Sequence, residues 1–544
     1  MSAPCEPGVA LTDAYDRAFA ALAQSRDNAP CPLALSEAGS VASVAAGIAL
    51  VSGLPGVGFE ELLRFPRGIV GIAFNLDEHQ IGVVLLGDYA QVRAGDRVER
   101  TGRVMDVGVG HALLGRVIDP LGRPLDGGPV PATSARLPIE RPATPIMERA
   151  AVDAPLQTGL KVIDALVPIG RGQRELLLGD RQTGKSAIAL DTILNQRAQD
   201  VLCVYCAIGQ RASSVAQAIA TLREHGALAY TVVMVTEGDD PAGLAYIAPY
   251  AATSIAEHFM EAGRDVLIVY DDLTQHARAY RELSLLLRRP PGREAFPGDI
   301  FYLHARLLER STRLCEARGG GSLTALPIIE TEAQDMAAYI PTNLISITDG
   351  QVYLSPSLFE LGVLPAVDVG QSVSRVGGKA QRAAYRSLTG ALKLAYAQFE
   401  ELESFVRFGA RPDPASLDLI AHGQRIRACL RQPQGEPVPV MAQLAVLVAL
   451  GDRLFDKVAL ARMAAAELAV QSAALLLPED LRERCTGGAV LGEQDRAAIV
   501  HACCAALAPF RDQDQAEKPE EKQEKKQEKK LAHAPATPAQ RTAP

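Results

Sequence analysis

The stretch that most constrains this chain reads Gly179-Asp180-Arg181-Gln182-Thr183-Gly184-Lys185-Ser186. It follows the apolar run Leu176–Leu178 and precedes the helix-like run Ala187–Leu190. A strand, a glycine-bounded turn and a helix form the context of a phosphate-binding loop, because glycines let several backbone N–H groups converge on one anion. The sequence therefore predicts that the chain binds a nucleoside triphosphate.

Two side chains of this loop are expected to meet the charge of the ligand. Lys185 would reach the β- and γ-phosphates, and Ser186 would take a ligand position on Mg²⁺. A carboxylate for the same ion is expected where the apolar strand Val266–Tyr270 ends in Asp271 and Asp272. In P-loop enzymes an acid at that position holds Mg²⁺ directly or through water. We assign this role to Asp271.

Hydrolysis needs a further group that orients or deprotonates the attacking water. In this class of enzyme a glutamate usually follows the strand after the P-loop helix, but Val204–Ile208 is followed here by Gly209 and Gln210. An amide orients water in some GTPases, yet it cannot accept a proton. The sequence therefore predicts a chain that holds nucleotide, with Gln210 at the site, rather than one that turns it over.

Length and charge exclude several classes of function. A chain of 544 residues is too long for one core, so about two to four domains are expected. The net charge is −9, aromatic residues make up 5% and tryptophan is absent, which argues against a nucleic-acid partner. The most apolar long run, Ala459–Leu477, is interrupted by Arg462 and Glu467. We expect a cytoplasmic protein without a secretory signal, whose membrane role is peripheral.

The nine cysteines are scattered and often lie in apolar runs, which indicates a reducing compartment. Cys203 and Cys206 have the spacing of a metal-binding pair but lie inside the apolar run Val201–Cys206. Residues three apart on a strand point to opposite faces, so these two thiols cannot share a metal. We interpret both as core cysteines.

Changes of pattern along the chain predict a multidomain α/β protein. Short β-like runs at Val41–Val51, Gly68–Phe74 and Ile81–Leu86, separated by turn residues, indicate a small barrel. Apolar strands that alternate with helical stretches indicate a parallel sheet covered on both faces. The strands expected there are Arg174–Leu178, Val201–Ile208, Thr231–Val235, Asp265–Tyr270 and Ala325–Glu330.

The ends of the chain differ from its middle. A weak amphipathic helix with a possible cap at Thr12 would carry Leu11, Tyr15, Phe19 and Leu22. After Gln381 the pattern is helical, and the tail is rich in Glu and Lys with no apolar face. The predicted parts are an N-terminal helical arm (1–37), a β-barrel domain (38–103), a P-loop, RecA-like nucleotide-binding domain (104–384), a C-terminal α-helical domain (385–511) and a disordered tail (512–544).

Several motifs together resemble the F-type ATP synthase α subunit, from about residue 39 to about residue 509. Besides the loop, the resemblance rests on Tyr270–Leu273, Leu286–Asp299, Ala338–Asn343, Ser346–Gly350 and Val369–Gly377. The Arg-Gln-Thr inside the loop resembles α rather than β subunits. The resemblance implies a regulatory subunit that retains Mg²⁺ with ATP or ADP while the β subunits carry out the chemistry.

The same resemblance implies partners and a place in the cell. The chain would alternate with β subunits in a hexamer around the central-stalk γ subunit, contact peripheral-stalk subunits, and meet the membrane only through the ion-conducting sector. That complex couples ATP synthesis or hydrolysis to proton or sodium transport, here at the cytoplasmic face of a bacterial inner membrane. No nucleic acid is implied.

Further site residues come from the resemblance alone. It places adenine-side contacts on Gln432 and Gln434, within Arg431-Gln432-Pro433-Gln434. It places on Arg375 the arginine given in trans to the β-subunit site, and matches Ser372 to a functionally sensitive position. A cation donated across the interface would neutralise charge developing on the γ-phosphate, an effect of about 10³–10⁵ in rate.

The chain also departs from the family pattern. Leu364 stands where members often have Arg, and Ser186 replaces the usual Thr while keeping the hydroxyl. The N-terminal arm bears little likeness to the family's stalk-binding helix, and the Glu/Lys tail is additional. Together these departures favour the alternative, second-operon type of α subunit, some of which are thought to be sodium-coupled.

Two other functions use a similar core. A self-sufficient homohexameric ATPase of the secretion type would lack the expected carboxylate in every subunit, because Gln210 takes its place. A Rho-like RNA translocase is disfavoured by the net charge of −9 and the scarcity of aromatic residues in the predicted barrel.

Overall fold

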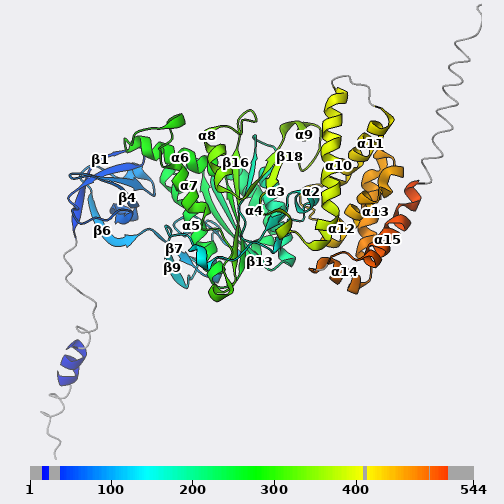
Figure 1. Cartoon of the computed structure of the whole chain (residues 1–544). Helices are drawn as coiled ribbons and strands as arrows, with labels where there is room; N and C mark the ends of the chain where they lie inside the picture. Colours follow the sequence, from blue (N-terminus) through cyan, green and yellow to red (C-terminus); the bar gives the residue numbers. More distant parts are fainter. Residues whose placement is uncertain (1–14, 24–36, 408–412, 489, 512–544) are drawn as a thin grey trace, which may run out of the picture.

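The computed structural model describes residues 15–23, 37–407, 413–488 and 490–511. Figure 1 shows a barrel, a helix-covered sheet and a helical domain side by side in chain order. This confirms the predicted α/β class with a barrel before the sheet and helices after it. Residues 15–23 are helical, and Tyr15, Phe19 and Leu22 are exposed there. Leu11, Thr12 and the tail lie outside the described residues.

The barrel closes around its own apolar core. Its strands, in order around the barrel, are β1 (Ala38–Ala45), β2 (Ile48–Ser52), β5 (Ile81–Leu85), β4 (Val70–Leu76), β3 (Glu61–Arg64) and β6 (Arg97–Val104). The predicted single run Val41–Val51 was wrong, because it is a hairpin. Ala46 and Gly47 both have positive φ, at 47° and 81°, which suits the tight turn of such hairpins.

The central sheet is parallel except at one edge. Its order is β18 (Val367–Ser374), β17 (Gly350–Leu354), β12 (Glu175–Gly179), β16 (Ser322–Glu330), β15 (Asp265–Asp271), β13 (Val201–Gln210), β14 (Thr231–Glu237) and β8 (Val117–Ile118). Only β18 runs antiparallel, against β17. The predicted core strands all lie in this sheet, whereas β8, β17 and β18 were not predicted.

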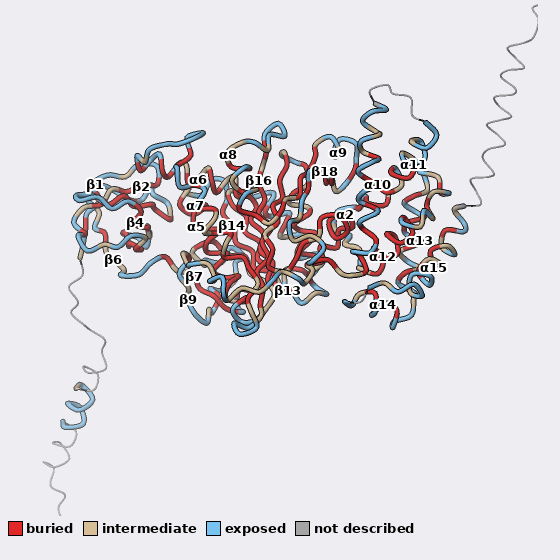
Figure 2. Tube along the Cα trace, in the orientation of Figure 1, coloured by how far each residue is buried: buried red, intermediate tan, exposed pale blue. Residues whose placement is uncertain are grey.

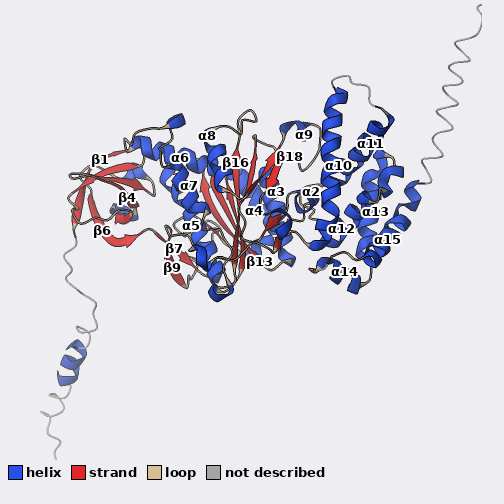
Figure 3. Cartoon of the chain, in the orientation of Figure 1, coloured by secondary structure: helices blue, strands red, loops and turns tan. Residues whose placement is uncertain are grey.

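Helices cover both faces of the sheet, as Figure 3 shows. One face packs on α3 (Lys185–Asn195) and α4 (Ala212–Glu224). The other packs on α5 (Ala242–Glu261), α6 (Leu273–Leu286) and α7 (Ile300–Leu308). Cys203 belongs to the first core and Cys206 to the second, which confirms that these thiols point to opposite faces. Figure 2 shows the strands as the most continuously buried part of the chain.

The first of these cores continues into the C-terminal domain without a break. Its helices are α10 (Ala383–Arg407), α11 (Pro414–Leu430), α12 (Val440–Gly451), α13 (Met463–Leu475), α14 (Glu479–Thr486) and α15 (Glu493–Arg511). Buried side chains along α10, including Leu392 and Phe399, join the core that begins under α3. Because apolar contacts cross this boundary, the helical domain and the sheet share one hydrophobic core.

Shorter elements connect these parts. They are β7 (Asp106–Val109) paired with β9 (Ala135–Pro138), β10 (Pro155–Leu156) paired with β11 (Ile169–Gly170), and the helices α2 (Lys161–Leu166), α8 (Tyr339–Ile347) and α9 (Pro356–Glu360). In the described part of the chain no single helix is long and apolar enough to cross a membrane. One pair, Leu460–Leu475 with Glu479–Thr486, passes by length and composition together but is bent by 105°.

Candidate nucleotide-binding site

The predicted loop turns between β12 and α3. Gly184 has φ of 97°, a conformation in which a side chain is strained, and α3 begins at the next residue. Lys185 is buried, and its Nζ donates to the backbone oxygens of Gly179 at 2.8 Å and Asp180 at 2.6 Å. Burial lowers the pKa of Lys185, and nearby carboxylates, Glu330 first, oppose that shift. An ammonium group hydrogen-bonded to loop carbonyls suits an incoming phosphate.

Other loop side chains hold the loop itself. The carboxylate of Asp180 accepts from Thr331 Oγ1 at 2.6 Å and from the backbone N–H of Gln334 at 3.0 Å. Arg181 is exposed and donates to Glu330 at 3.0 Å. The Thr183 hydroxyl donates to the carbonyl of Asp180, and Gln182 is exposed with φ of 61°. These contacts hold the curved backbone of the loop, whose N–H groups would point towards a bound phosphate.

The expected metal ligands lie together beside the loop. Asp271 is buried and hydrogen-bonded to Ser186, and its Oδ2 accepts from the Tyr205 hydroxyl at 2.7 Å. Burial raises the pKa of Asp271, and the bonds from Ser186 and Tyr205 oppose this. Burial and the neighbouring charge of Asp271 raise the pKa of Asp272 to about 7. Sequence reasoning missed Tyr205, although a tyrosine inside an apolar strand usually needs a partner for its hydroxyl.

This pair of oxygen ligands fits Mg²⁺. Among the described residues no group of three or more His, Cys, Asp or Glu could hold a metal ion alone. Magnesium usually binds through one or two protein oxygens and completes its octahedron with waters and substrate phosphates. Ser186 and Asp271 supply that number of protein ligands, next to a loop shaped for phosphate.

Gln210 lies at the end of β13, beside Asp271, so it is at the site as the sequence predicted. Its Nε2 donates to Asp271 Oδ1 at 3.2 Å. A glutamate in the same position would set a second carboxylate against Asp271, so the amide stabilises the acid instead of competing with it. Ser186, Tyr205, Gln210, Asp271 and Gln434 line one cavity of about 240 Å³ beside the loop.

The two glutamines assigned to the adenine side differ in placement. Gln434 lines the cavity, whereas Gln432 is buried elsewhere. The Gln432 amide donates to the carbonyls of Gly159 and Glu436, each at 2.8 Å, and accepts from Lys161 N at 3.1 Å. Its backbone N–H donates to the carbonyl of Leu364, whose side chain is exposed. Here Gln432 fixes the backbone around the site, and only Gln434 is free to face a ligand.

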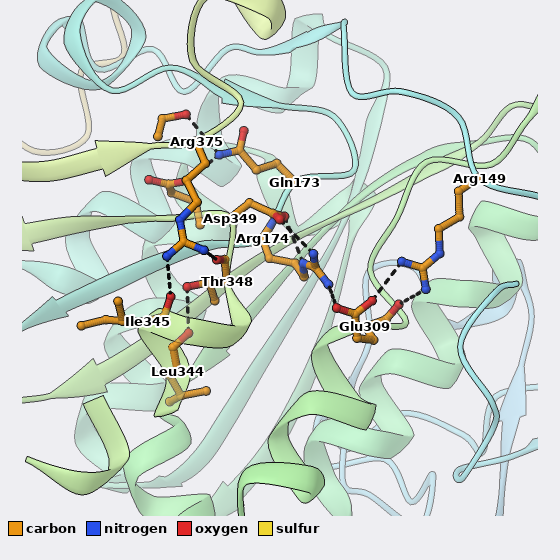
Figure 4. A network of polar contacts seen from close by, with 11 residues as sticks. Arg149, Gln173, Arg174, Glu309, Leu344, Ile345, Thr348, Asp349 and Arg375 are labelled. Carbon is orange, nitrogen blue, oxygen red and sulfur yellow. Dashed lines mark hydrogen bonds and ion pairs between the residues drawn. The ribbon is translucent and has the colours of Figure 1, made fainter. Parts of the chain in front are cut away.

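Arg375 lies at the opposite end of the sheet from the loop. Glu175 pairs with Gly350, which pairs with Ser374, whereas Gly179 pairs with Leu354. Four strand residues therefore separate the two ends, which is about 13 Å at 3.3 Å per residue. Arg375 is exposed, and its guanidinium donates to the carbonyls of Thr348 and Ile345, each at 3.2 Å, as Figure 4 shows.

A network of ion pairs supports the backbone that holds Arg375 (Figure 4). Arg174 donates to both carboxylate oxygens of Asp349, at 3.0 and 2.8 Å, and also contacts Glu309. Arg149 completes the network by donating to Glu309 at 2.9 Å. The Asp349 carbonyl accepts from the backbone N–H of Arg375 at 2.8 Å. These partners are far apart in sequence, so sequence reasoning did not identify them.

Ser372 is buried and does not reach the surface beside Arg375. Its hydroxyl donates to the carbonyl of Asp368 at 2.5 Å and accepts from the backbone N–H of Tyr353 at 3.0 Å. The pairing of β17 with β18 shifts register between Gln351 and Tyr353. The hydroxyl therefore replaces a ladder hydrogen bond lost at the irregularity, and it shapes the strand that carries Arg375.

Comparison with known proteins places these features in a family. Family models of the ATP synthase alpha/beta family match the β-barrel domain at residues 35–102, the nucleotide-binding domain at 159–374 and the C-terminal domain at 381–505. ATP synthase subunit alpha 2 of Albidiferax ferrireducens is 70% identical over 513 residues, covering 94% of this chain and 96% of that protein. ATP synthase subunit alpha 2 of Polaromonas naphthalenivorans is 70% identical over 511 residues, covering 94% and 98%.

A relative named as an alpha 1 subunit is also similar to this chain. ATP synthase subunit alpha 1 of Marinomonas sp. is 68% identical over 496 residues, covering 91% of this chain and 97% of that protein. Identity at this level over nearly the full length of each relative confirms the resemblance that the motifs indicated. The chain belongs to the ATP synthase alpha/beta family and, within it, to the alpha subunits.

Proposed function

We propose that this alpha subunit retains Mg²⁺ with ATP or ADP at its own site and does not hydrolyse it. The observation that carries the proposal is the amide of Gln210, which donates to Asp271 at 3.2 Å in the place of a water-activating carboxylate. Lys185 and the loop N–H groups would hold the phosphates, Ser186 and Asp271 the metal, and Gln434 the base. Bound nucleotide stabilises the folded chain by mass action.

The second part of the proposal concerns a neighbouring subunit. Arg375 is exposed, lies at the end of the sheet away from the loop of its own chain, and donates to two carbonyl groups. We assign it to the catalytic site of a β subunit, where its planar fork would meet charge developing on the γ-phosphate. Ser372 contributes in trans only indirectly, as a positioning residue that shapes the strand before Arg375.

Membership of the family supports a proposal for the assembly and its location. The partners proposed are β subunits in an alternating hexamer, the central-stalk γ subunit and peripheral-stalk subunits, at the cytoplasmic face of the inner membrane. The complex would couple ATP synthesis or hydrolysis to proton or sodium transport. The numbered names of the relatives support the second-operon type. The predicted domain boundaries at 37, 103, 384 and 511 are retained as part of this proposal.

One comparison of ATPase rates tests the function. The purified chain is assayed alone, with RNA, and with a β-subunit partner. We expect no significant turnover alone or with RNA, and turnover with the partner. Stimulation by RNA would instead support a Rho-like translocase, and turnover by the chain alone a homohexameric ATPase of the secretion type. Native mass measurement of the active complex gives the subunit ratio directly.

A further inference from the structure

A second cavity lies where the helical domain meets the covered sheet, away from the nucleotide-binding loop. Its volume is about 440 Å³, and residues from the end of α3, the segment just before α10, the start of α12, and α14 line it. Figure 1 shows α14 below α12 at this junction. A cavity of this size admits a small molecule rather than a single water.

Two arginines give this cavity its chemical character. Arg382, immediately before α10, and Arg482, on α14, both line it. The Nε of each is enclosed and lacks a hydrogen-bond partner. Arg382 makes one side-chain contact, donating to the carbonyl of Thr486. Among the described residues neither guanidinium has an ion-pair partner. Two guanidinium groups that form no ion pair within the described residues therefore line one cavity.

The described carboxylates around the cavity form no ion pair with either arginine. Asp164 is buried, and its oxygens already accept from two backbone N–H groups, a hydroxyl and an amide. Burial raises its pKa, which disfavours the charged form. Glu479 and Glu483 flank Arg482 on α14 and also line the cavity, but both are exposed and form no bond with either arginine.

We infer that this cavity binds a phosphate-type oxyanion between Arg382 and Arg482. A guanidinium presents a planar fork of N–H donors that matches phosphate oxygens, and its charge strengthens each hydrogen bond. The bound anion would join α14 to the start of α10 and so fasten the edge of the helical domain to the sheet. This site is separate from the loop at Lys185, and the inference does not depend on the proposed function.

Equilibrium dialysis with radiolabelled inorganic phosphate tests this site. The full chain is kept in saturating Mg-ATP, so that the loop is already filled, and at fixed ionic strength. We expect saturable binding of one phosphate per chain. Arg482→Gln should weaken it about tenfold or more, because a charge-assisted bond is lost. Arg223→Gln removes an equal charge from an exposed part of α4 and should leave binding unchanged.

A second variant and a second anion sharpen the result. Arg382→Gln should weaken binding similarly, with circular dichroism confirming that the chain remains folded, because Arg382 also contacts Thr486. If unlabelled pyrophosphate displaces the labelled phosphate more strongly than unlabelled phosphate does, the cavity is assigned to a larger phosphorylated metabolite. If the two anions compete equally, it is assigned to free phosphate. Non-saturable binding, or equal binding by the Arg482→Gln chain, would overturn the inference and leave water or Glu479 and Glu483 as the partners of the arginines.

Discussion

Replacing Arg375 by lysine separates the two roles proposed for this subunit. The present contacts are two hydrogen bonds to carbonyls at 3.2 Å each, which together contribute about 1–3 kcal/mol. A finger arginine contributes about 10³–10⁵ in rate, or roughly 4–7 kcal/mol. The carbonyl contacts are therefore weak enough to be exchanged for phosphate oxygens. Lysine keeps the charge but lacks the fork that spans two oxygens.

The expected result is a collapse of ATP turnover in the reconstituted complex without loss of this chain's own nucleotide. Roughly 13 Å of strand separates the two ends of β12, so the loop at Lys185 is out of reach of Arg375. Turnover is measured at saturating ATP, and bound nucleotide is measured after gel filtration. The matched control is Arg386→Lys, because Arg386 is exposed on α10 and donates to the carbonyl of Gln381. Near-normal turnover in the Arg375→Lys complex, or loss of the chain's own nucleotide, would refute the role in trans.

Three further changes test other parts of the chain. Lys185→Ala should abolish nucleotide retention through gel filtration, whereas Arg223→Ala, at an exposed position on α4, should retain it; equal ATP content in both would contradict the loop assignment. Gln210→Glu should leave the isolated chain without ATPase activity, because the arginine must come from a neighbouring subunit; substantial turnover would mean a near-complete site. Burial lowers the pKa of His304 to about 4. Between about pH 6.5 and that value only the unfolded chain binds a proton at this residue, so the free energy of unfolding falls by about 2 kcal/mol by about pH 5. His304→Leu should remove that part of the acid sensitivity in urea unfolding, and an unchanged pH dependence would disprove it.

The sequence predicted the regular parts of the fold because their patterns are local. Apolar strands such as Val201–Gln210 and Asp265–Asp271 are continuous, and their ends are set by glycine or carboxylate residues. The hairpin at Ala46 was missed because alanine is rarely found with positive φ. The edge strand Val367–Ser374 was missed because its alternation of buried and exposed residues breaks at Gly370 and Gln371, beside an irregular pairing.

The site residues also fall into those that local patterns predict and those that depend on tertiary contacts. Lys185, Ser186 and Asp271 were predictable because each belongs to a short motif next to a strand. Tyr205 reaches Asp271 from the neighbouring strand, and such a contact depends on sheet order. The resemblance indicated Gln432, but the backbone groups that occupy its amide come from residues up to 273 positions away. Contacts of that separation are set by tertiary packing, which local patterns do not contain.

The pairing of β12 with β17 also has a mechanical consequence. The two strands are hydrogen-bonded in register from Glu175 to Gly179, and the Asp349 carbonyl just before β17 binds the backbone of Arg375. A buried, paired strand behaves as a stiff rod, because sliding it by one residue would turn every side chain to the wrong face. We therefore expect a tilt of this strand pair to move the loop and Arg375 together. Nucleotide held at a non-catalytic site would in this way influence the position of Arg375, the arginine proposed to serve the neighbouring site.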